Sequence, residues 1–501
     1  RRIESGAPEE HTSVVVPSLT FDVAELAKIQ GIQFYEERSL ASLLRMRDPR
    51  ARVVFVTSQP VHPEIVAYYL GLLPGMRRRD AERRLALVST HDARPRPLTE
   101  KILARPRLIE RLRSLIGDPE NAYLTCFNTT ELEAELAGEL GVPLNGADPS
   151  LGWIGTKSGS RRVFEEAGVP LGPGESGVRT KADVVDALDR LREGTREVRR
   201  AVIKLDDSFA GAGNALYAFP AELPKGSRER RKALEAALGE LRPASGEPAA
   251  DFLAKLETMG GVVELYLESA EGKPLSSPSV QLRIDPEGEI RLLSTHEQVL
   301  EGPIGQTYVG CRFPADERHR NAIRDHGFAV ARVLRDRGVI GRFGIDFLSG
   351  GDGTDLFAIE INLRMGGTTF PFMTLESLVE GTLDPESGEY VAADGVRKRY
   401  FATDNLRSAA YAGLTPEDFF EIIQGYGLLF DRTTGTGPVF HMIGALSEHG
   451  RVGVTCIADR AADAEARYRD VVAVLDRECP ADRVVGAPPS HPMGLSISRM
   501  E

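Results

Sequence analysis

Hydrophobic and polar positions follow two successive patterns along this chain. Up to about residue 150, short apolar runs alternate with segments of helical periodicity. The runs are VVFVTS after Arg52, LALVST at 85–90 and AYLTCF at 122–127, with helices expected from Pro63 and over 102–116. This βαβα order predicts a parallel, doubly wound sheet of the α/β class. No G-x-G-x-x-G follows any of these runs, so the usual dinucleotide fingerprint is absent.

Later in the chain, two β-prone runs flank a glycine-rich turn. Residues 341–348 and 355–363 are joined by SGGDGT, which predicts an antiparallel hairpin. With the turn centred near Gly353, Asp346 lies opposite Glu360, and Asn362 projects from the same face. The other face is expected to be a core made of Ile345, Phe347, Phe357, Ile359 and Ile361.

The polar face of this hairpin carries candidate chemistry. Two facing carboxylates repel each other unless a cation or a proton lies between them. A small number of oxygen ligands suits Mg²⁺ that carries phosphates. Arg364 and the loop 366–369 follow at once and could hold a developing anion beside that metal. A hairpin with a solvated acidic face is the alternative that D…E-x-N alone leaves open.

Two lysines precede the hairpin in settings that favour an anion. Lys157 opens a helix that ends at Gly168, where its charge opposes the helix dipole unless an anion binds there. Lys204 closes the apolar strand 201–205 just before a glycine-rich loop, whose backbone N–H groups can approach phosphate oxygens. The alternative for Lys157 is a solvated lysine, and the alternative for the glycine-rich loop after Lys204 is a plain hairpin turn.

The remaining elements are assigned more coarsely. The strand 261–268 contains VELYLE, whose free backbone edge could pair with adenine at a hinge. Strands at 279–284 and 289–294 are followed by His296 and Gln298, and His296 is either a satisfied loop histidine or a residue facing substrate. Residues 221–250 are expected in a mobile lid, 315–337 in a long helix, and 438–477 in a hairpin and a helix.

Composition restricts the partners. The net charge is -12 over 501 residues, which argues against a nucleic acid or an anionic membrane as partner. The four cysteines lie far apart, so neither a disulfide framework nor a zinc site is indicated. No apolar run approaches the ~18 residues of a membrane span. These features are typical of a cytoplasmic protein.

The order of these motifs resembles the ATP-grasp superfamily. Lys157, Lys204, the glycine loop, VELYLE and GIDF…EINLR occur in that superfamily's order. Four stretches look most similar to the actinobacterial peptide ligases of the pheganomycin type: QGIQFYEERSL, TKSGSRRVFEEAGVP, KLDDSFAGAGN and STHEQVLEGPIGQTYVGCRFP. The resemblance implies a pre-ATP-grasp α/β domain at 1–150, an ATP-grasp lid subdomain at 151–268, a central subdomain with the metal site at 269–410 and a small C-terminal α/β cap at 411–501.

The resemblance also implies roles for individual residues. ATP phosphates would be contacted by Lys157 and Lys204 and covered by Gly211, Gly213 and Asn214. The main chain of Glu264, Tyr266 and Leu267 would hold adenine, and Glu268 or Glu271 would hold the ribose. The implied magnesium ligands are Asp346, Glu360 and Asn362, and Arg364, together with Lys204, would act in catalysis at the acyl phosphate.

The hypothesis that follows is an ADP-forming, ATP- and Mg²⁺-dependent ligase that joins a carboxylate to an amine. A non-catalytic ATP-binding regulatory protein is the alternative, and a thiol or hydroxyl acceptor is a third possibility. Gly344 stands where D-alanine:D-alanine ligases carry a substrate-binding arginine, which argues against that type of substrate. His296, Tyr308 and Arg312 are further candidates for substrate contact. The sequence leaves the oligomeric state open, and a homodimer is a possibility that rests on analogy of fold alone.

Overall fold

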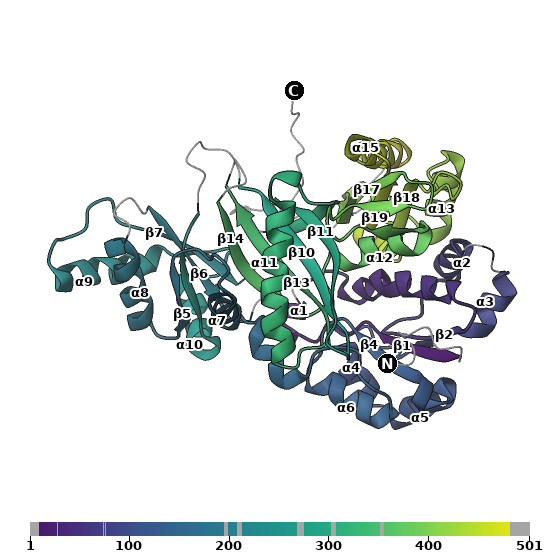
Figure 1. The fold of residues 1–501 in the computed structure, drawn as a ribbon, viewed down its shortest axis with the longest axis horizontal. Helices are drawn as coiled ribbons and strands as arrows, with labels where there is room; N and C mark the ends of the chain where they lie inside the picture. The colour runs from purple at the N-terminus through teal and green to yellow at the C-terminus, as the bar shows by residue number, and fades with distance from the viewer. Residues whose placement is uncertain are drawn as a thin grey trace.

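The computed structural model describes residues 10–27, 29–73, 75, 77–194, 199–207, 213–267, 275–301, 307–350 and 355–480. These residues form three β-sheets with helices packed on them (Figure 1). In that view the five-stranded sheet lies at the left, the large sheet runs through the middle to the right, and the four-stranded sheet lies below. No helix of the described residues is long and apolar enough to cross a membrane.

The N-terminal sheet is parallel, as the alternating pattern predicts. Its strand order is β3-β2-β1-β4, from β1 (His11–Val16), β2 (Ala51–Thr57), β3 (Leu85–Ser89) and β4 (Ala122–Cys126). The helices and 3₁₀ segments of this region are α1 (Val23–Ala27), η1 (Ile32–Arg47), α2 (Pro63–Gly71), α3 (Arg78–Arg84), α4 (Leu98–Leu103), α5 (Pro106–Ile116), η2 (Pro119–Asn121) and α6 (Glu131–Leu140).

Three local details of this region differ from the sequence-based prediction or refine it. The single helix expected over 102–116 is two helices, because Pro106 takes the first position of α5, where its missing N–H is harmless. The N-cap of α6 is Thr130, which forms a capping box with Glu133. Strand β1 and the 3₁₀ helix η1 are not expected from the sequence.

The five-stranded sheet is antiparallel and has the order β5-β9-β6-β7-β8. Its strands are β5 (Gly174–Val178), β6 (Arg200–Leu205), β7 (Asn214–Ala218), β8 (Arg242–Pro243) and β9 (Gly261–Leu265). It is accompanied by η3 (Pro149–Gly155), α7 (Lys157–Ala167), α8 (Lys181–Gly194), α9 (Ser227–Ala237), η4 (Leu238–Glu240) and α10 (Ala249–Met259). Side chains from α8, α9 and α10 form one apolar cluster with β6 and β7, so these helices cover one face of the sheet.

The large sheet has ten strands and carries the predicted acidic hairpin at one edge. Its main path is β14-β13-β10-β11-β12-β17-β16-β15, and β19 pairs with both β17 and β18. The strands are β10 (Ser277–Ile284), β11 (Ile290–Glu301), β12 (Thr307–Phe313), β13 (Gly341–Ser349), β14 (Leu356–Asn362), β15 (Gly381–Leu383), β16 (Tyr390–Ala392), β17 (Arg397–Arg407), β18 (Gly437–His441) and β19 (Arg451–Ala458).

Helices cover this sheet and extend it toward the C-terminus. They are α11 (Glu317–Asp336), α12 (Thr369–Leu378), η5 (Ala409–Tyr411), α13 (Pro416–Gly425), α14 (Ala445–His449) and α15 (Ala461–Glu478). Ile323, Val330 and Leu334 of α11 are buried in one cluster with β10 and β13. The expected C-terminal hairpin and helix are present as β18, β19 and α15. Their strands continue the large sheet through β17.

Candidate active site

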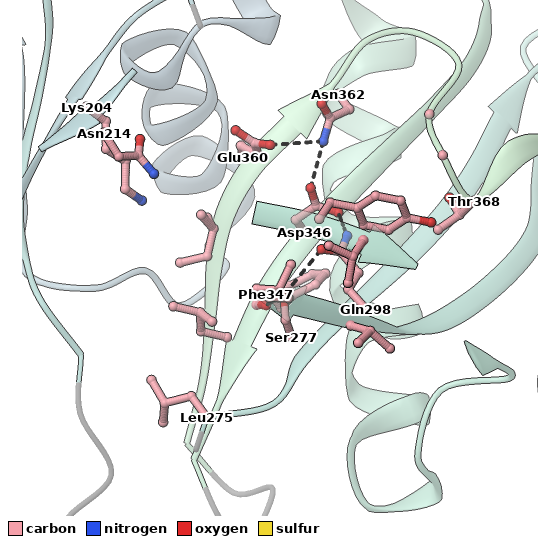
Figure 2. A pocket seen from close by; sticks show the side chains of 18 of the residues that line it. Lys204, Asn214, Leu275, Ser277, Gln298, Asp346, Phe347, Glu360, Asn362 and Thr368 are labelled. Carbon is pink, nitrogen blue, oxygen red and sulfur yellow. Dashed lines mark hydrogen bonds between the residues drawn. The ribbon is translucent and has the colours of Figure 1, made fainter. Parts of the chain in front are cut away.

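One large cavity opens where the sheets meet. Its volume is about 790 Å³, and both the five-stranded and the ten-stranded sheet line it. Figure 2 shows Lys204 and Asn214 on one side of this space and the hairpin residues Asp346, Glu360 and Asn362 on the other. The predicted nucleotide, metal and catalytic residues that the structure describes all line the cavity, apart from Gly213, which directly precedes the lining residue Asn214.

The hairpin has the register predicted from its turn. Asp346 of β13 pairs with Glu360 of β14, and Gly344 pairs with Asn362. The Asn362 Nδ2 atom donates to Asp346 Oδ2 at 2.8 Å and to Glu360 Oε1 at 3.3 Å (Figure 2). One amide therefore joins the two carboxylates on a single face, as the alternation of side chains requires.

The predicted core face of this hairpin is wrong at two positions. A register shift after Asp346 pairs Phe347 with Ala358, which leaves Ile359 as an extra residue on β14. Leu356 and Ala358 are therefore buried in the core, while Phe357 is only half-buried and Ile359 lines the cavity. Simple two-residue alternation cannot anticipate a bulge of this kind.

The two carboxylates differ in their electrostatic surroundings. Burial and the neighbouring Glu360 raise the pKa of Asp346. Burial also acts to raise the pKa of Glu360, but the charges of Lys157 and Arg364 outweigh it and hold that pKa below its ordinary value. The Lys157 ammonium donates directly to Glu360 from the first turn of α7. Among the described residues, Asp346 accepts from two neutral side-chain amides, those of Asn362 and Gln298, the latter at 2.6 Å.

On the opposite wall, a carboxylate lies between two cations. Lys204 Nζ and Arg161 both contact Glu264, each at 2.7 Å, and all three side chains are buried. Burial raises the pKa of Glu264, but Lys204 and Arg161 more than reverse this effect and lower it. Asn214 of β7 lies opposite Lys204 of β6 in the sheet. Arg161 is a functional candidate that sequence reasoning missed, since its partner is 103 positions away.

The predicted adenine hinge is only partly available to a ligand. The Leu265 amide donates to the Pro173 carbonyl at 2.9 Å, and the Tyr266 amide donates to the Arg200 carbonyl at 3.2 Å. These two amides hold β9 in its sheet, so a nucleotide would have to use other main-chain groups near Leu267. Leu267 and Tyr266 both line the cavity. The predicted ligands Gly211, Glu268 and Glu271 lie outside the described residues.

Arg364 follows the hairpin and lines the cavity beside both carboxylates. Its guanidinium lies 5.8 Å from the Phe21 ring centroid and 5.7 Å from that of Phe127. Burial lowers the pKa of Arg364, although Glu360 and Asp346 oppose that shift. In the loop that follows, a side chain at Gly367 would collide with the Tyr308 ring, so only glycine allows this close approach.

The substrate candidates His296, Tyr308 and Arg312 divide into two groups. Tyr308 and Arg312 line the cavity, and Arg312 also pairs with Glu465 at 2.7 Å. His296 is fully buried and shares a 2.6 Å hydrogen bond with the Tyr400 hydroxyl. It lies within β11, as does Gln298, so the expected loop position after that strand is wrong. His296 is a core histidine whose Nδ1 atom has no hydrogen-bond partner among the described residues, and it is not among the residues that line the cavity.

The donor set at the hairpin fits a magnesium ion. Two carboxylates and one amide oxygen offer the hard oxygen ligands that Mg²⁺ prefers, with room for water and phosphate. Nowhere in the described ranges do three or more His, Cys, Asp or Glu side chains gather as a metal site. A metal here would therefore depend on phosphate oxygens as well as on Asp346, Glu360 and Asn362.

Comparison with known proteins places this architecture in a family. Residues 38–142 match the Pre ATP-grasp domain, residues 152–234 and 248–386 match the IQCH-like ATP-grasp domain, and residues 418–471 match the PGM1 C-terminal domain. The L-propargylglycine--L-glutamate ligase of Streptantibioticus cattleyicolor is 32% identical over 94% of this chain and 95% of that protein. The chain belongs to the ATP-grasp ligases. The predicted superfamily, fold class and enzyme class are thereby confirmed.

Two further relatives extend the comparison of this ATP-grasp ligase. The IQ motif-containing protein H of Danio rerio is 22% identical over 95% of this chain, which spans 49% of that protein. The biotin carboxylase domain of the Hydrogenobacter thermophilus 2-oxoglutarate carboxylase was solved with MgADP, ADP and bicarbonate. It has a TM-score of 0.53 at 13% identity and covers 92% of this chain and 89% of that one, so it supports the fold.

Proposed function

We propose that this ATP-grasp ligase joins the carboxylate of one amino acid or small peptide to the amine of another, with ATP as the energy source and ADP as product. The observation that carries the proposal is the shared cavity of about 790 Å³. Lys157, Lys204 and Arg364 face the same space as the carboxylate pair Asp346 and Glu360. The amino-acid class of the substrates is supported by the L-propargylglycine--L-glutamate ligase at 32% identity.

The nucleotide end of the cavity is assigned to the wall with Lys157, Lys204 and Asn214. These lysines would neutralise phosphate oxygens, and the hinge at Tyr266 and Leu267 would receive the adenine. Lys157 now donates to Glu360, so it would have to exchange or share that contact when phosphates arrive. Lys204 keeps Glu264 as a fixed partner and would present its charge from a preset position.

Asp346, Glu360 and Asn362 would hold Mg²⁺ between the hairpin and the phosphates. The metal would supply charge neutralisation for the transferring phosphoryl group. Neighbouring side chains of the large sheet keep these three residues in place before any ligand binds. Their hydrogen bonds to Gln298 and to one another fix the carboxylate orientation.

The reaction would proceed in two steps. In the first, a carboxylate oxygen of the donor attacks the γ-phosphorus of ATP, the bond to ADP breaks, and an acyl phosphate forms. In the second, a neutral amine attacks the acyl carbon, phosphate leaves, and the amine loses a proton. Arg364 and Lys204 would stabilise the negative charge that develops in these steps, which are governed by positioning and electrostatics.

A hydroxylamine assay tests this proposal. The enzyme is incubated with Mg²⁺-ATP, hydroxylamine as surrogate acceptor, and a panel of amino acids, dipeptides and aromatic acids, while hydroxamate and ADP are measured together. Hydroxamate that depends on one carboxylate identifies acyl-phosphate chemistry and its donor. ATP binding without either product for any donor would contradict the proposal and favour a regulatory ATP-binding protein. Thiol and hydroxyl acceptors belong in a second panel.

The homodimer stays a prediction, which sedimentation of the purified chain tests.

A further inference from the structure

We propose that Arg38 and Arg451 form a second anion site in this cavity, which binds the substrate carboxylate that is not activated. This inference rests on the proposed ligase function and deepens it. Both arginines line the cavity, yet neither belongs to the ATP-grasp hairpin or to the two lysine-bearing elements. Arg38 comes from η1 of the N-terminal region, and Arg451 begins β19 near the C-terminal end of the described chain.

Arg38 has an unused donor in a buried setting. Only 4% of this residue is exposed. Its Nε atom donates to the Tyr35 carbonyl at 3.4 Å, and one terminal nitrogen donates to Asp404 Oδ2 at 3.0 Å. The other terminal nitrogen is buried and has no hydrogen-bond partner among the described residues. Such a group is costly unless a ligand satisfies it, because an arginine offers five N–H donors and cannot lose its charge.

Asp404 and Tyr35 hold the two arginines together. Arg451 Nε donates to the Asp404 carbonyl at 2.8 Å, while the Asp404 carboxylate receives Arg38 on one oxygen and shares a 2.6 Å hydrogen bond with His441 on the other. The guanidinium groups lie 4.7 Å (Arg38) and 4.9 Å (Arg451) from the same Tyr35 ring centroid. This framework fixes the direction of both side chains before any substrate binds.

The charge of this cluster suits one carboxylate. Among the described residues of this cluster, two arginines accompany one carboxylate, that of Asp404, so one positive charge remains even with His441 neutral. Burial acts to raise the pKa of Asp404, but Arg38 and His441 hold it well below its ordinary value, so Asp404 stays ionised and offsets one of the two arginine charges. The planar fork of a guanidinium matches the two oxygens of a carboxylate. The phosphates of ATP are already assigned to the lysine wall.

The cluster lies close to the proposed activation site. Phe127 contacts both, since its ring centroid is 5.2 Å from the Arg38 guanidinium and 5.7 Å from that of Arg364. The positive charge of Arg38 also lowers the pKa of Arg364. A substrate could therefore present one carboxylate to Arg364 and another to Arg38, or a donor and an acceptor could each use one arginine.

The experiment compares substrates with and without the spare carboxylate in the wild type and in the Arg38→Gln and Arg451→Gln variants. L-Glutamate and its two monocarboxamides are the first donors, assayed with hydroxylamine, which carries no carboxylate. L-Propargylglycine and its carboxamide are the first acceptors. Arg47→Gln is the matched control, because Arg47 also lies on η1 but is 40% exposed and is not among the residues lining the cavity.

The expected result is a rise in KM on the order of 10- to 100-fold for the substrate whose carboxylate binds Arg38, with a smaller change in kcat. Amidation of that carboxylate should raise the KM of the wild type by a similar factor. The same amidation should raise the KM of Arg38→Gln little further. A raised KM in the hydroxylamine reaction shows that the bound carboxylate belongs to the donor. A raised KM seen only when the amine acceptor replaces hydroxylamine shows that it belongs to the acceptor.

Two results would overturn the inference. One is an unchanged KM for both substrates in Arg38→Gln and Arg451→Gln. The other is a rise in KM on amidation of the substrate that is equally large in Arg38→Gln and in the wild type. A misfolded Arg38→Gln would show in its melting curve, and Arg451→Gln, which is less buried, then carries the same comparison. Failure of the ligase proposal is distinguishable, since the wild type itself would form no hydroxamate, and the second site would then lose its basis.

Discussion

The two sheets that face each other across the cavity compensate their charges in different ways. On the five-stranded sheet, Glu264 lies between Lys204 and Arg161 and has two cations for one carboxylate. On the hairpin of the large sheet, Asp346 is held by neutral amides, while its neighbour Glu360 has Lys157. The first wall has one positive charge in excess of its carboxylate and needs no further cation. The second wall lacks one positive charge at Asp346, which is where a metal ion would complete it.

The direction of the pKa shifts expresses the same difference. Burial raises the pKa of both Glu264 and Asp346, but only at Glu264 do neighbouring cations reverse the effect. A wall with a fixed excess of positive charge suits the binding of nucleotide phosphates. A wall that needs a cation couples phosphate binding to the metal. A variant that alters one of the two walls should therefore affect either metal-dependent turnover or stability.

The largest effect is expected from removing the proposed metal ligands. Asp346→Ala and Glu360→Ala should each reduce ADP formation by about 1000-fold or more, because the transferring phosphoryl group loses its metal. ADP release measured at saturating Mg²⁺-ATP and donor gives the result. Circular dichroism and a melting curve serve as the control for folding. Full turnover in either folded variant would contradict the metal assignment.

Glu264→Gln should affect stability more than any other change on the nucleotide wall. It leaves Lys204 and Arg161 buried without their anion, which typically costs about 3–5 kcal/mol. Urea unfolding without nucleotide measures this free energy. Glu175→Gln is the matched control on the same sheet, since its exposed pair with Arg190 is worth only about 0–1 kcal/mol. Equal stability losses in the two variants would show that the buried contacts of Glu264 with Lys204 and Arg161 contribute no more to stability than an exposed ion pair.

The contrast between the walls also separates what the sequence predicts from what it does not. The hairpin register, Lys157 at a helix start and Lys204 at a strand end follow from local periodicity and turn signals. The bulge at Ile359 cannot be predicted in this way, because the alternation of apolar and polar residues does not reveal where an extra residue is inserted. Arg161 and Arg38 were missed for another reason, since their partners Glu264 and Asp404 are 103 and 366 positions away. Such pairs depend on the tertiary fold.

Gln298→Leu should weaken the metal wall without removing a ligand. Gln298 donates to Asp346 at 2.6 Å and is itself contacted by the Ser277 hydroxyl at 3.4 Å. Its loss frees the Asp346 carboxylate to rotate, and changes of this kind cost roughly 10- to 100-fold in metal affinity. The Mg²⁺ concentration for half-maximal ADP formation is the measurement. Ser277→Ala, one hydrogen bond further away, should produce a smaller shift, and an unchanged Mg²⁺ dependence in Gln298→Leu would refute the positioning role.

The smallest expected effect is a pH dependence of stability that distinguishes the two walls. The folded-state pKa of Asp346 is raised above its unfolded value, so the folded chain binds this proton more tightly. The resulting stability is fully present below the unfolded pKa and is lost as pH rises from about 4 into the neutral range.

Metal-free wild type should therefore lose stability relative to Asp346→Asn over that interval. Urea unfolding of both proteins in a chelating buffer, at a series of pH values, measures the difference. Glu264 has the opposite sign, since its lowered pKa adds stability above its unfolded pKa that is lost as pH falls. Mg²⁺ with ATP should cancel the loss at Asp346 and release a proton, because the metal binds the ionised carboxylate. Parallel curves for wild type and Asp346→Asn would mean that Asp346 is ionised in the folded protein without the metal.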